Sequence, residues 1–347
     1  MNKKILSVHS KSALPKLNYN VAVVNKLEDD FRLFIGKLQD APEAAYTLLA
    51  QMLQDDESVG CDGVGVYLSS YIYELLKLNI SLNSNQTDIN VILTSTSPRR
   101  KDLLSKALPA QQLSIIDPGN QIEYDIKSVR PEIAVMNIAL QKIISFAFTN
   151  KLTLNQNSII IASDTFINLG NGERVGKINQ ESVPLGDQIE KLQSQMGKEI
   201  KATTGLVVYK IQDGAIHINN ACSTVRFRPL DCPMSAEERQ LLTSLVEDKE
   251  YKYLKPLLLK EIVTVQDITE AYCVEGKHKN KAGGFGIQDR ELFLCIENIL
   301  GDPCTVVGLP VSIINSRFID SFITMRSVSE IISSYWPEEI ERTKIVY

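Results

Sequence analysis

Short apolar segments alternate with longer segments of helical spacing from residue 90 onward, and this alternation constrains the fold more than any other feature of the chain. Residues 131–148 predict a largely buried helix, and residues 202–227 predict a hairpin that turns at Asp213-Gly214. Three apolar runs predict buried strands: residues 91–93, 113–116 and 158–162. Strands that alternate with helices in this way predict an α/β domain.

The first 88 residues lack this alternation and carry no pattern that indicates chemistry. Residues 42–54 and 66–78 predict two helices, separated by a glycine-rich turn at residues 60–65. We therefore expect an N-terminal extension over residues 1–88 and an α/β domain over residues 89–347. The sequence leaves open whether the extension is a small interaction domain, a packing element or a partly disordered segment.

Composition and charge indicate a globular protein of the cytoplasm. The chain of 347 residues is 44% hydrophobic, and its formal net charge of −5 argues against a general affinity for nucleic acid or for an anionic membrane. The longest apolar stretch, residues 133–148, is interrupted by Asn137, Gln141 and Lys142, so it does not predict a membrane span. The six cysteines form no C-x-x-C pair and no signal-peptide pattern is present, which predicts reduced thiols in the cytoplasm.

A serine- and arginine-rich segment follows the first predicted strand and indicates a phosphate site. We expect Ser97 to cap a helix that begins at Pro98, because serine and proline favour these two positions. Arg99 and Arg100 then lie in the first turn, where cations oppose the helix dipole. A bound anion reverses this effect, since backbone N–H groups, guanidiniums and the hydroxyls of Ser95 and Ser97 can all reach it. The alternative is an ordinary capped helix with two solvated arginines.

Several charged residues outside this segment are further candidates. Asp164 ends the third predicted strand beside Thr165, and a carboxylate at such a strand end suits a metal ligand or a base that activates water. The alternative is that Asp-Thr simply turns the chain. Lys142 interrupts an apolar helix, so its ammonium either extends to solvent or meets an anion. Lys177 could contact a phosphate or be a solvated surface charge, and Glu123 lies in a polar loop where an acid is ordinarily solvated.

The glycine-rich loop at residues 282–288 permits a close approach of its backbone to a ligand. Gln288 carries an amide, which can both donate and accept hydrogen bonds, as the reading of a base edge requires. The spacing matches neither a Walker A loop nor a dinucleotide-binding loop. A serine hydrolase and a zinc site are not predicted, because the chain lacks a Gly-x-Ser-x-Gly elbow and cysteine or histidine pairs of ligand spacing.

Taken in order along the chain, these segments resemble the Maf family of nucleoside triphosphate pyrophosphatases. The resemblance covers about residues 90–326 and is strongest at residues 95–100, which are similar to the family's Ser-x-Ser-Pro-Arg-Arg loop. Further motifs follow in the same order: Ser163-Asp164-Thr165, Gly176-Lys177, Thr204-Gly205, Lys281-Ala282-Gly283 through Gln288, and Val306-Val307-Gly308-Leu309-Pro310. Each motif is modest alone, and their shared order is what makes the resemblance specific.

The resemblance implies a mixed, twisted sheet flanked by helices, with a deep cleft between two lobes. It implies hydrolysis of a nucleoside triphosphate by water attack on the α-phosphorus, which releases pyrophosphate. Glu123 and Asp164 would bind a divalent metal, Mg²⁺ or Mn²⁺, and Asp164 would also accept the proton of the water. The residues implied to hold the triphosphate are Ser95, Ser97, Arg99, Arg100, Lys142 and Lys177.

Within the family, the combination of Arg99, Thr165 and Gln288 resembles the branch that hydrolyses dTTP and UTP, which implies a preference for ordinary or modified pyrimidines. A homodimer is plausible by the same resemblance. The chain departs from the family at Ile178, Ile200 and Asp289, where the family's motifs have proline, histidine and glycine. An insertion at about residues 247–264 and the first 88 residues have no counterpart in the short bacterial members. The alternative hypothesis is a nucleotide-binding regulator, like a septation inhibitor, with weak or lost catalysis.

Overall fold

The computed structural model describes residues 21–55, 61–79, 81–83, 89–119, 123–150, 153–170, 172–175, 183–317, 326–335 and 344–346. Contacts within the chain divide it into two compact units. Unit 1 comprises Met1–Asp164, Thr204–Ala221 and Ile313–Met325. Unit 2 comprises Thr165–Thr203, Cys222–Ser312 and Arg326–Tyr347.

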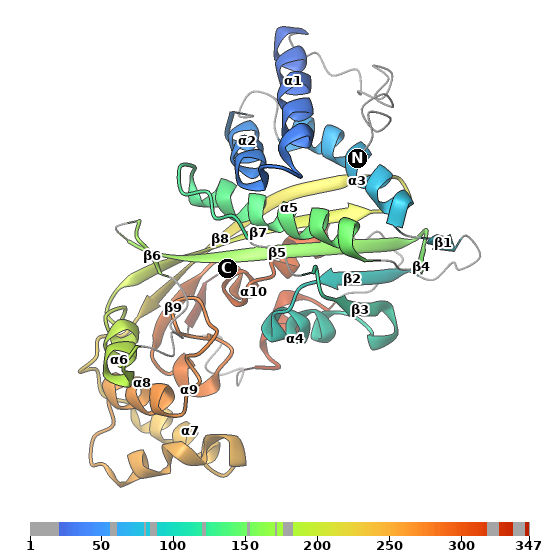
Figure 1. Cartoon of the computed structure of the whole chain (residues 1–347). Helices are drawn as coiled ribbons and strands as arrows, with labels where there is room; N and C mark the ends of the chain where they lie inside the picture. The colour runs from blue at the N-terminus through green and yellow to red at the C-terminus, as the bar shows by residue number, and fades with distance from the viewer. Residues whose placement is uncertain are drawn as a thin grey trace. The chain divides into compact units, whose positions relative to one another are not determined.

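In the part of the chain that the structure describes, eight strands form a mixed sheet in the order β10-β9-β8-β7-β5-β2-β3, with β6 paired to β5. Figure 1 labels the strands of this sheet other than β10. β2 (Asn90–Thr94) pairs in parallel with β3 (Leu113–Ile116) and with β5 (Ser158–Leu169), whereas β8 (Ile216–Phe227) pairs antiparallel with β9 (Ile296–Leu300). The other strands are β6 (Arg174–Val175), β7 (Glu199–Lys210), β10 (Ile345–Val346) and a separate parallel pair, β1 (Ser81–Asn83) with β4 (Thr153–Asn155). A mixed sheet flanked by helices confirms the predicted fold class, and the cleft between lobes stays a prediction.

Strand β5 is longer than the sequence predicts. The expectation that it ends at Ser163-Asp164-Thr165 is wrong, because the strand continues to Leu169. Its second half is held by antiparallel pairing with β6, in which Ile167 lies opposite Val175. Asp164 therefore lies within an extended strand, three residues beyond Ile161, the last residue of β5 that pairs with β2.

Helix α5 (Pro131–Thr149) is the core helix of unit 1, as predicted. It is long and apolar enough to cross a membrane, but 83% of its most apolar window is buried inside the protein, which is the burial of a core helix. It packs against β2 and against two helices that precede the sheet, α2 (Pro42–Asp55) and α3 (Cys61–Asn79). Helix α4 (Pro98–Ala107) packs against β3.

Among its described residues, the N-terminal extension contributes three helices to unit 1. α2 and α3 confirm the two predicted helices, and α1 (Val21–Lys37) adds a third, whose Phe31 and Phe34 are buried. The predicted turn at residues 60–65 is wrong over residues 61–65, because α3 begins at Cys61. Gly65 lies on this helix. A Cβ at this position would lie 3.4 Å from the side chain of Ile216, so glycine here permits α3 to pack closely against Ile216. Asn137 of α5 donates a buried hydrogen bond to the Tyr46 carbonyl of α2 (3.0 Å).

Unit 2 contains β6, β9, β10, a series of short helices, and the parts of β5, β7 and β8 that fall within its residues. Ser235 and Glu238 form a capping box at the start of α7 (Ala236–Leu245), in which each side chain satisfies the other residue's backbone N–H. The segment predicted as an insertion forms a 3₁₀ helix, η4, over Lys249–Leu259. The remaining helices of unit 2 are α6 (Leu185–Gln193), α7 (Ala236–Leu245), α8 (Val265–Val274), α9 (Arg290–Phe293), α10 (Pro303–Val307) and α12 (Val328–Ile332), while α11 (Val311–Arg317) spans the division between the units.

A substitution at Gly205 of β7 tests how closely β7 packs against the backbone of α5. A Cβ at this position would lie 2.4 Å from the carbonyl carbon of Val135 and 2.6 Å from the nitrogen of Met136. Both contacts are with backbone, so we expect Gly205→Ala to lower the free energy of unfolding by about 1–3 kcal/mol or more through overpacking. The measurement is urea unfolding followed by circular dichroism.

The matched control is Gly36→Ala in α1, where a Cβ would meet nothing within 4 Å. Alanine at such a helix position is expected to raise the free energy of unfolding by about 0.5–1 kcal/mol. An equal, small effect of both substitutions would contradict the close approach of β7 to α5.

Candidate active site

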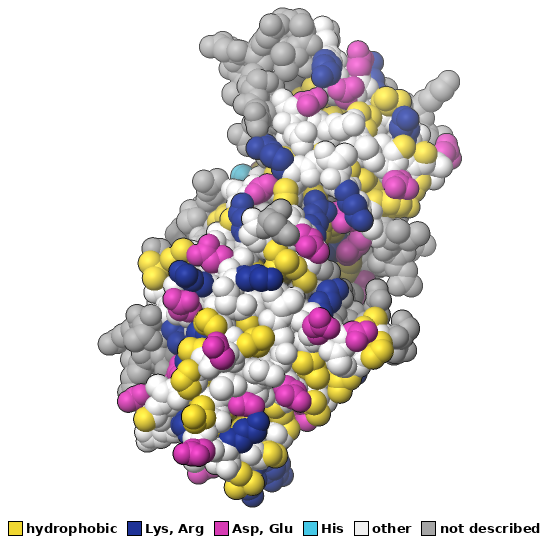
Figure 2. Space-filling view, turned by 90° about the vertical axis from the view of Figure 1, so that its left-hand side faces the viewer, with side chains coloured by type: hydrophobic (Ala, Val, Ile, Leu, Met, Phe, Trp, Pro, Cys, Tyr) yellow, Lys and Arg dark blue, Asp and Glu magenta, His cyan; other side chains and the backbone are white. Residues whose placement is uncertain are grey.

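Charged side chains of both signs are interspersed over the face shown in Figure 2. Ion pairs of half-exposed side chains, such as Arg226–Glu297 at 3.2 Å, typically contribute no more than about 1 kcal/mol. A different kind of charged group lies in unit 1, where two cations and one carboxylate are largely buried together. Burial makes these three charges expensive unless they are paired, and each of them has a partner in this cluster.

The loop between β2 and α4 agrees with the prediction in the start of the helix but not in the capping hydrogen bond expected of Ser97. α4 begins at Pro98, and Ser97 precedes it in an extended conformation. The Ser97 side chain makes no capping hydrogen bond, while its backbone N–H donates to the Oγ of buried Ser95 (3.2 Å). Arg99 and Arg100 lie in the first turn, and Arg100 is buried. The helix N-terminus therefore keeps a hydroxyl that is not used for capping, in a position typical of anion-binding loops.

Arg100 and Lys142 converge on Asp164. Asp164 Oδ1 lies 2.7 Å from Lys142 Nζ and 3.5 Å from Arg100 Nη2. Lys142 Nζ also donates to the carbonyl of Ser163 (3.2 Å) and lies 3.2 Å from Glu123 Oε1. The Lys142 side chain is 9% exposed and that of Asp164 is 15% exposed. Of the two alternatives for Lys142, the structure shows that the ammonium meets anions.

The loop that carries Glu123 is fastened to α5 by Gln141. The backbone N–H of Tyr124 donates to Gln141 Oε1 and the Tyr124 carbonyl accepts from Gln141 Nε2, both at 2.9 Å. The Tyr124 ring stacks on that of Tyr46 from the N-terminal extension, with centroids 5.8 Å apart. Sequence analysis missed this role of Gln141, although an amide on a buried helix signals that a polar partner is required.

Glu123 and Asp164 offer the oxygen donors that Mg²⁺ and Mn²⁺ prefer. Both carboxylates contact the same ammonium, that of Lys142, so they lie close to each other. Among the described residues, no cluster of three or more histidine, cysteine or acidic side chains forms a closed metal site. Two carboxylates without further protein ligands fit a cation that completes its shell with water and substrate phosphate.

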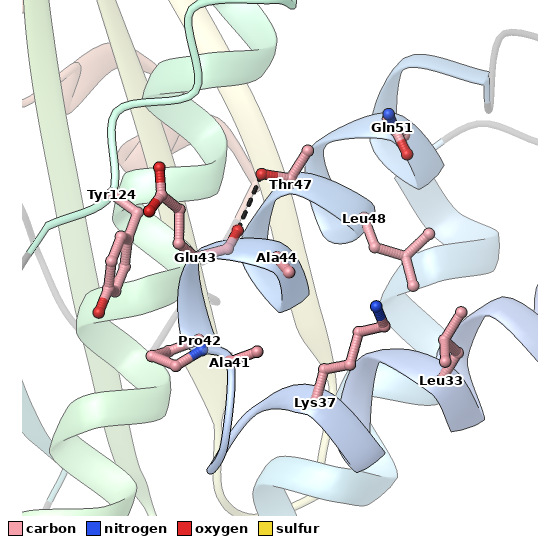
Figure 3. Close-up of a pocket in the computed structure, with 10 residues that line it drawn as sticks. All are labelled: Leu33, Lys37, Ala41, Pro42, Glu43, Ala44, Thr47, Leu48, Gln51 and Tyr124. Atoms are coloured by element: carbon pink, nitrogen blue, oxygen red, sulfur yellow. Dashed lines mark hydrogen bonds between the residues drawn. The ribbon is translucent and has the colours of Figure 1, made fainter.

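A separate hollow of about 750 Å³ lies elsewhere in unit 1, among the residues labelled in Figure 3. It is lined by Leu33 and Lys37 of α1, by residues of α2 from Pro42 to Gln51, and by Tyr124. None of the predicted site residues lines it, and Tyr124 is its link to the loop of Glu123. This hollow is therefore distinct from the charged cluster.

The glycine-rich loop of unit 2 holds Gln288 and Asp289. Gly283 and Gly284 have φ of +68° and +74°, which glycine adopts without strain. Asp289 Oδ2 accepts hydrogen bonds from Tyr272 and Lys281, and Asp289 Oδ1 accepts from Gln288 Nε2 (3.2 Å). Burial and the neighbouring Asp289 raise the pKa of Tyr272 well above its usual value, so its hydroxyl remains a donor. The extra negative charge of Asp289 is therefore paired with Lys281.

The structure places the predicted site residues in both units. Within unit 1, Lys142 contacts Glu123 and Asp164, and Asp164 also contacts Arg100. Ser95, Ser97 and Arg99 lie on the loop and helix that carry Arg100. Thr165 and Gln288 belong to unit 2. Lys177 lies outside the described residues, so its predicted role stays a prediction.

The sequence is similar to those of known proteins. The sequence model described as "Maf-like protein" matches residues 90–246 and 258–318, so the gap falls within the segment predicted as an insertion. A dTTP/UTP pyrophosphatase of Clostridium botulinum (strain Kyoto / Type A2) is 27% identical over 240 residues, which cover 68% of this chain and 99% of that protein. A dTTP/UTP pyrophosphatase of Pyrococcus furiosus is 29% identical over 228 residues, covering 65% and 91% respectively.

Removing the buried lysine of the cluster should lower the free energy of unfolding more than removing an exposed lysine. Lys142→Met leaves Asp164 with only part of its compensation, so we expect the free energy of unfolding to fall by about 3 kcal/mol. Lys106→Met, which breaks a more exposed pair with Asp102 (2.9 Å), should cost less than about 1 kcal/mol. Urea unfolding of both variants checks this.

Adding Asp164→Asn to Lys142→Met should restore part of the lost stability, because the uncompensated charge is removed. Equal losses in Lys142→Met and Lys106→Met, or no recovery in the double variant, would contradict the buried pair.

Proposed function

The chain belongs to the Maf-like protein family, and we propose that it hydrolyses a nucleoside triphosphate to the monophosphate and pyrophosphate, with dTTP, UTP or a modified pyrimidine nucleotide as substrate. The family and the two relatives named dTTP/UTP pyrophosphatase support a hydrolase that acts on nucleotides. The observation that carries the proposal is the convergence of Arg100, Lys142 and Asp164 next to the serine-containing loop that precedes α4.

Positive groups near the α4 loop suit a triphosphate. A polyphosphate carries several negative charges, and guanidinium, ammonium, hydroxyl and helix N–H groups stabilise them by charge-assisted hydrogen bonds. Ser95, Ser97, Arg99 and Arg100 bind the phosphates in this proposal, together with Lys142 and Lys177. The same cations stabilise the charge that develops on the leaving pyrophosphate.

Asp164 is the proton acceptor in the proposed reaction. A water molecule attacks the α-phosphorus, its proton passes to Asp164, and the bond between the α-phosphorus and the bridging oxygen breaks, so that pyrophosphate leaves with that oxygen. Glu123 and Asp164 would hold a divalent cation, which when bound supplies positive charge to the phosphate oxygens. The contact with Lys142 keeps Asp164 oriented within β5.

The pyrimidine preference rests on Arg99, Thr165 and Gln288, which match the residues of the dTTP- and UTP-hydrolysing branch. Their contact with a nucleotide, the homodimer and the cytoplasmic location remain predictions. A free nucleotide is the proposed partner. Asp289 stands where the family has glycine, and its pairing with Lys281 means that it brings no unpaired negative charge to the loop of Gln288.

Asp164→Asn tests the reaction. We expect wild type to release pyrophosphate from dTTP and UTP in the presence of Mg²⁺ or Mn²⁺, and Asp164→Asn to reduce the rate by about 100-fold or more, because general base catalysis is lost. Asp102→Asn on the exposed face of α4 is the matched control and should retain the wild-type rate. The measurement is pyrophosphate release from a panel that includes CTP, 5-methyl-UTP, GTP and 7-methyl-GTP.

The same panel separates enzyme from regulator. Nucleotide binding by calorimetry without turnover of any nucleotide would reject the pyrophosphatase and favour a nucleotide-binding regulator. A full rate in Asp164→Asn would leave the hydrolysis intact and reject the role of Asp164.

Glu123→Gln tests the proposed metal ligand. Removing one of two carboxylates should raise the Mn²⁺ concentration for half-maximal activity by about tenfold, because the charge of the ligand set falls. Asp125→Asn, in the same loop, is the control and should leave this concentration unchanged. An unchanged Mn²⁺ requirement in Glu123→Gln would show that Glu123 does not bind the cation.

A further inference from the structure

The amide of Gln288 is held in one orientation by its neighbour. Gln288 Nε2 donates to Asp289 Oδ1 (3.2 Å). The close backbone of the loop permits this contact, since a Cβ on Gly286 would lie 2.4 Å from Gln288 Nε2 and 2.7 Å from Asp289 Oδ2. Within the part of the chain that the structure describes, Gln288 Oε1 accepts no hydrogen bond. This oxygen is the acceptor of the amide, so it is available to an N–H group of a ligand.

Asp289 is itself fixed. Its Oδ2 accepts from the Tyr272 hydroxyl (2.5 Å) and from the Lys281 ammonium, which also donates to Tyr272 (2.8 Å). Tyr272 is fully buried, and Lys281 and Asp289 are largely buried, so this arrangement has little freedom to rotate. A carboxylate paired with an ammonium is ionised and only accepts hydrogen bonds.

A carboxylate that only accepts can face only the NH₂ of Gln288. If the amide turned over, Oε1 would meet Asp289 Oδ1, and two acceptors would oppose each other without a proton between them. A glutamine without this neighbour can turn over freely and match either a donor or an acceptor on its ligand. Asp289 therefore converts an adaptable amide into one with a fixed polarity.

We propose that Asp289 is a positioning residue for substrate choice, which makes Gln288 present its acceptor Oε1 to N3 of the base. Uracil and thymine carry a hydrogen on N3, whereas N3 of cytosine is an acceptor that Oε1 repels. The inference rests on the proposed function and deepens it. It explains the selection of UTP and dTTP over CTP by residues of this chain. Oε1 attracts the N3 hydrogen of uracil and thymine and repels N3 of cytosine, and specificity requires both an attraction and a repulsion.

Asp289→Asn is the decisive variant, because it keeps the size and shape of the side chain. Lys281 and Tyr272 both donate, so they retain the amide oxygen of the new asparagine, and its NH₂ then faces Gln288. Gln288 must turn over to accept from that NH₂, and it presents Nε2 to the base. The ratio of kcat/KM for UTP to that for CTP should fall on the order of 10- to 100-fold, the discrimination typical of a matched base contact.

Two controls separate positioning from structural damage. Asp213→Asn, in the exposed turn between β7 and β8, should leave the UTP/CTP ratio at its wild-type value. In a Gln288→Ala background, Asp289→Asn should no longer change the ratio, because residue 289 acts through Gln288. The equilibrium binding of UTP and CTP to all variants, measured by calorimetry, is determined alongside turnover.

The outcomes distinguish this inference from the proposed function. A fall in the ratio that requires Gln288 supports the inference. An unchanged ratio in Asp289→Asn, or an equal change in the Gln288→Ala background, overturns it while turnover continues. If wild type binds nucleotides without hydrolysing them, the proposed function fails, and the ratio of the two Kd values decides the inference by the same criteria. If neither nucleotide binds, both are overturned.

Discussion

A buried ammonium in an apolar helix is the constraint on which the rest of unit 1 depends. Lys142 lies in the middle of α5, among side chains that are almost all buried, and an unpaired ammonium there would cost several kcal/mol. The contacts with Asp164, Glu123 and the Ser163 carbonyl offset this cost. They also fix three pieces of chain relative to one another: α5, strand β5 and the loop before α5. The ammonium of Lys142, which the core accommodates because it is paired, therefore also organises the proposed site.

The packing around α5 makes this arrangement rigid. Gly205 lets β7 approach the helix backbone closely, and Asn137 ties α5 to the N-terminal extension through Tyr46. The Gln141 amide holds the loop that carries Glu123, because it forms hydrogen bonds with both the backbone N–H and the carbonyl of Tyr124. Three polar side chains on one apolar helix, Asn137, Gln141 and Lys142, therefore each have a definite partner. The N-terminal extension also supports the loop that carries Glu123, because the Tyr46 ring stacks on that of Tyr124.

Local signals in the sequence could predict the fold class and the loop of α4. Pro98 and the apolar spacing of α4 and α5 act over a few residues, and the structure follows them. The end of β5 could not be predicted, because its second half depends on pairing with β6. The start of α3 could not be predicted, because glycine favours turns locally. Gly65 instead lies within the helix and permits close packing against Ile216. Spacing could nominate Lys142 and Asp164, yet their 2.7 Å contact depends on tertiary packing.

The central claim is that the charged cluster around Asp164 directs water to the α-phosphorus of a nucleoside triphosphate. Hydrolysis of UTP in ¹⁸O-labelled water, followed by mass spectrometry of both products, tests this most directly. The account predicts that the label enters the monophosphate and that the released pyrophosphate is unlabelled. Label in pyrophosphate, or release of orthophosphate with a diphosphate product, would contradict it, because the water would then have attacked the β- or γ-phosphorus.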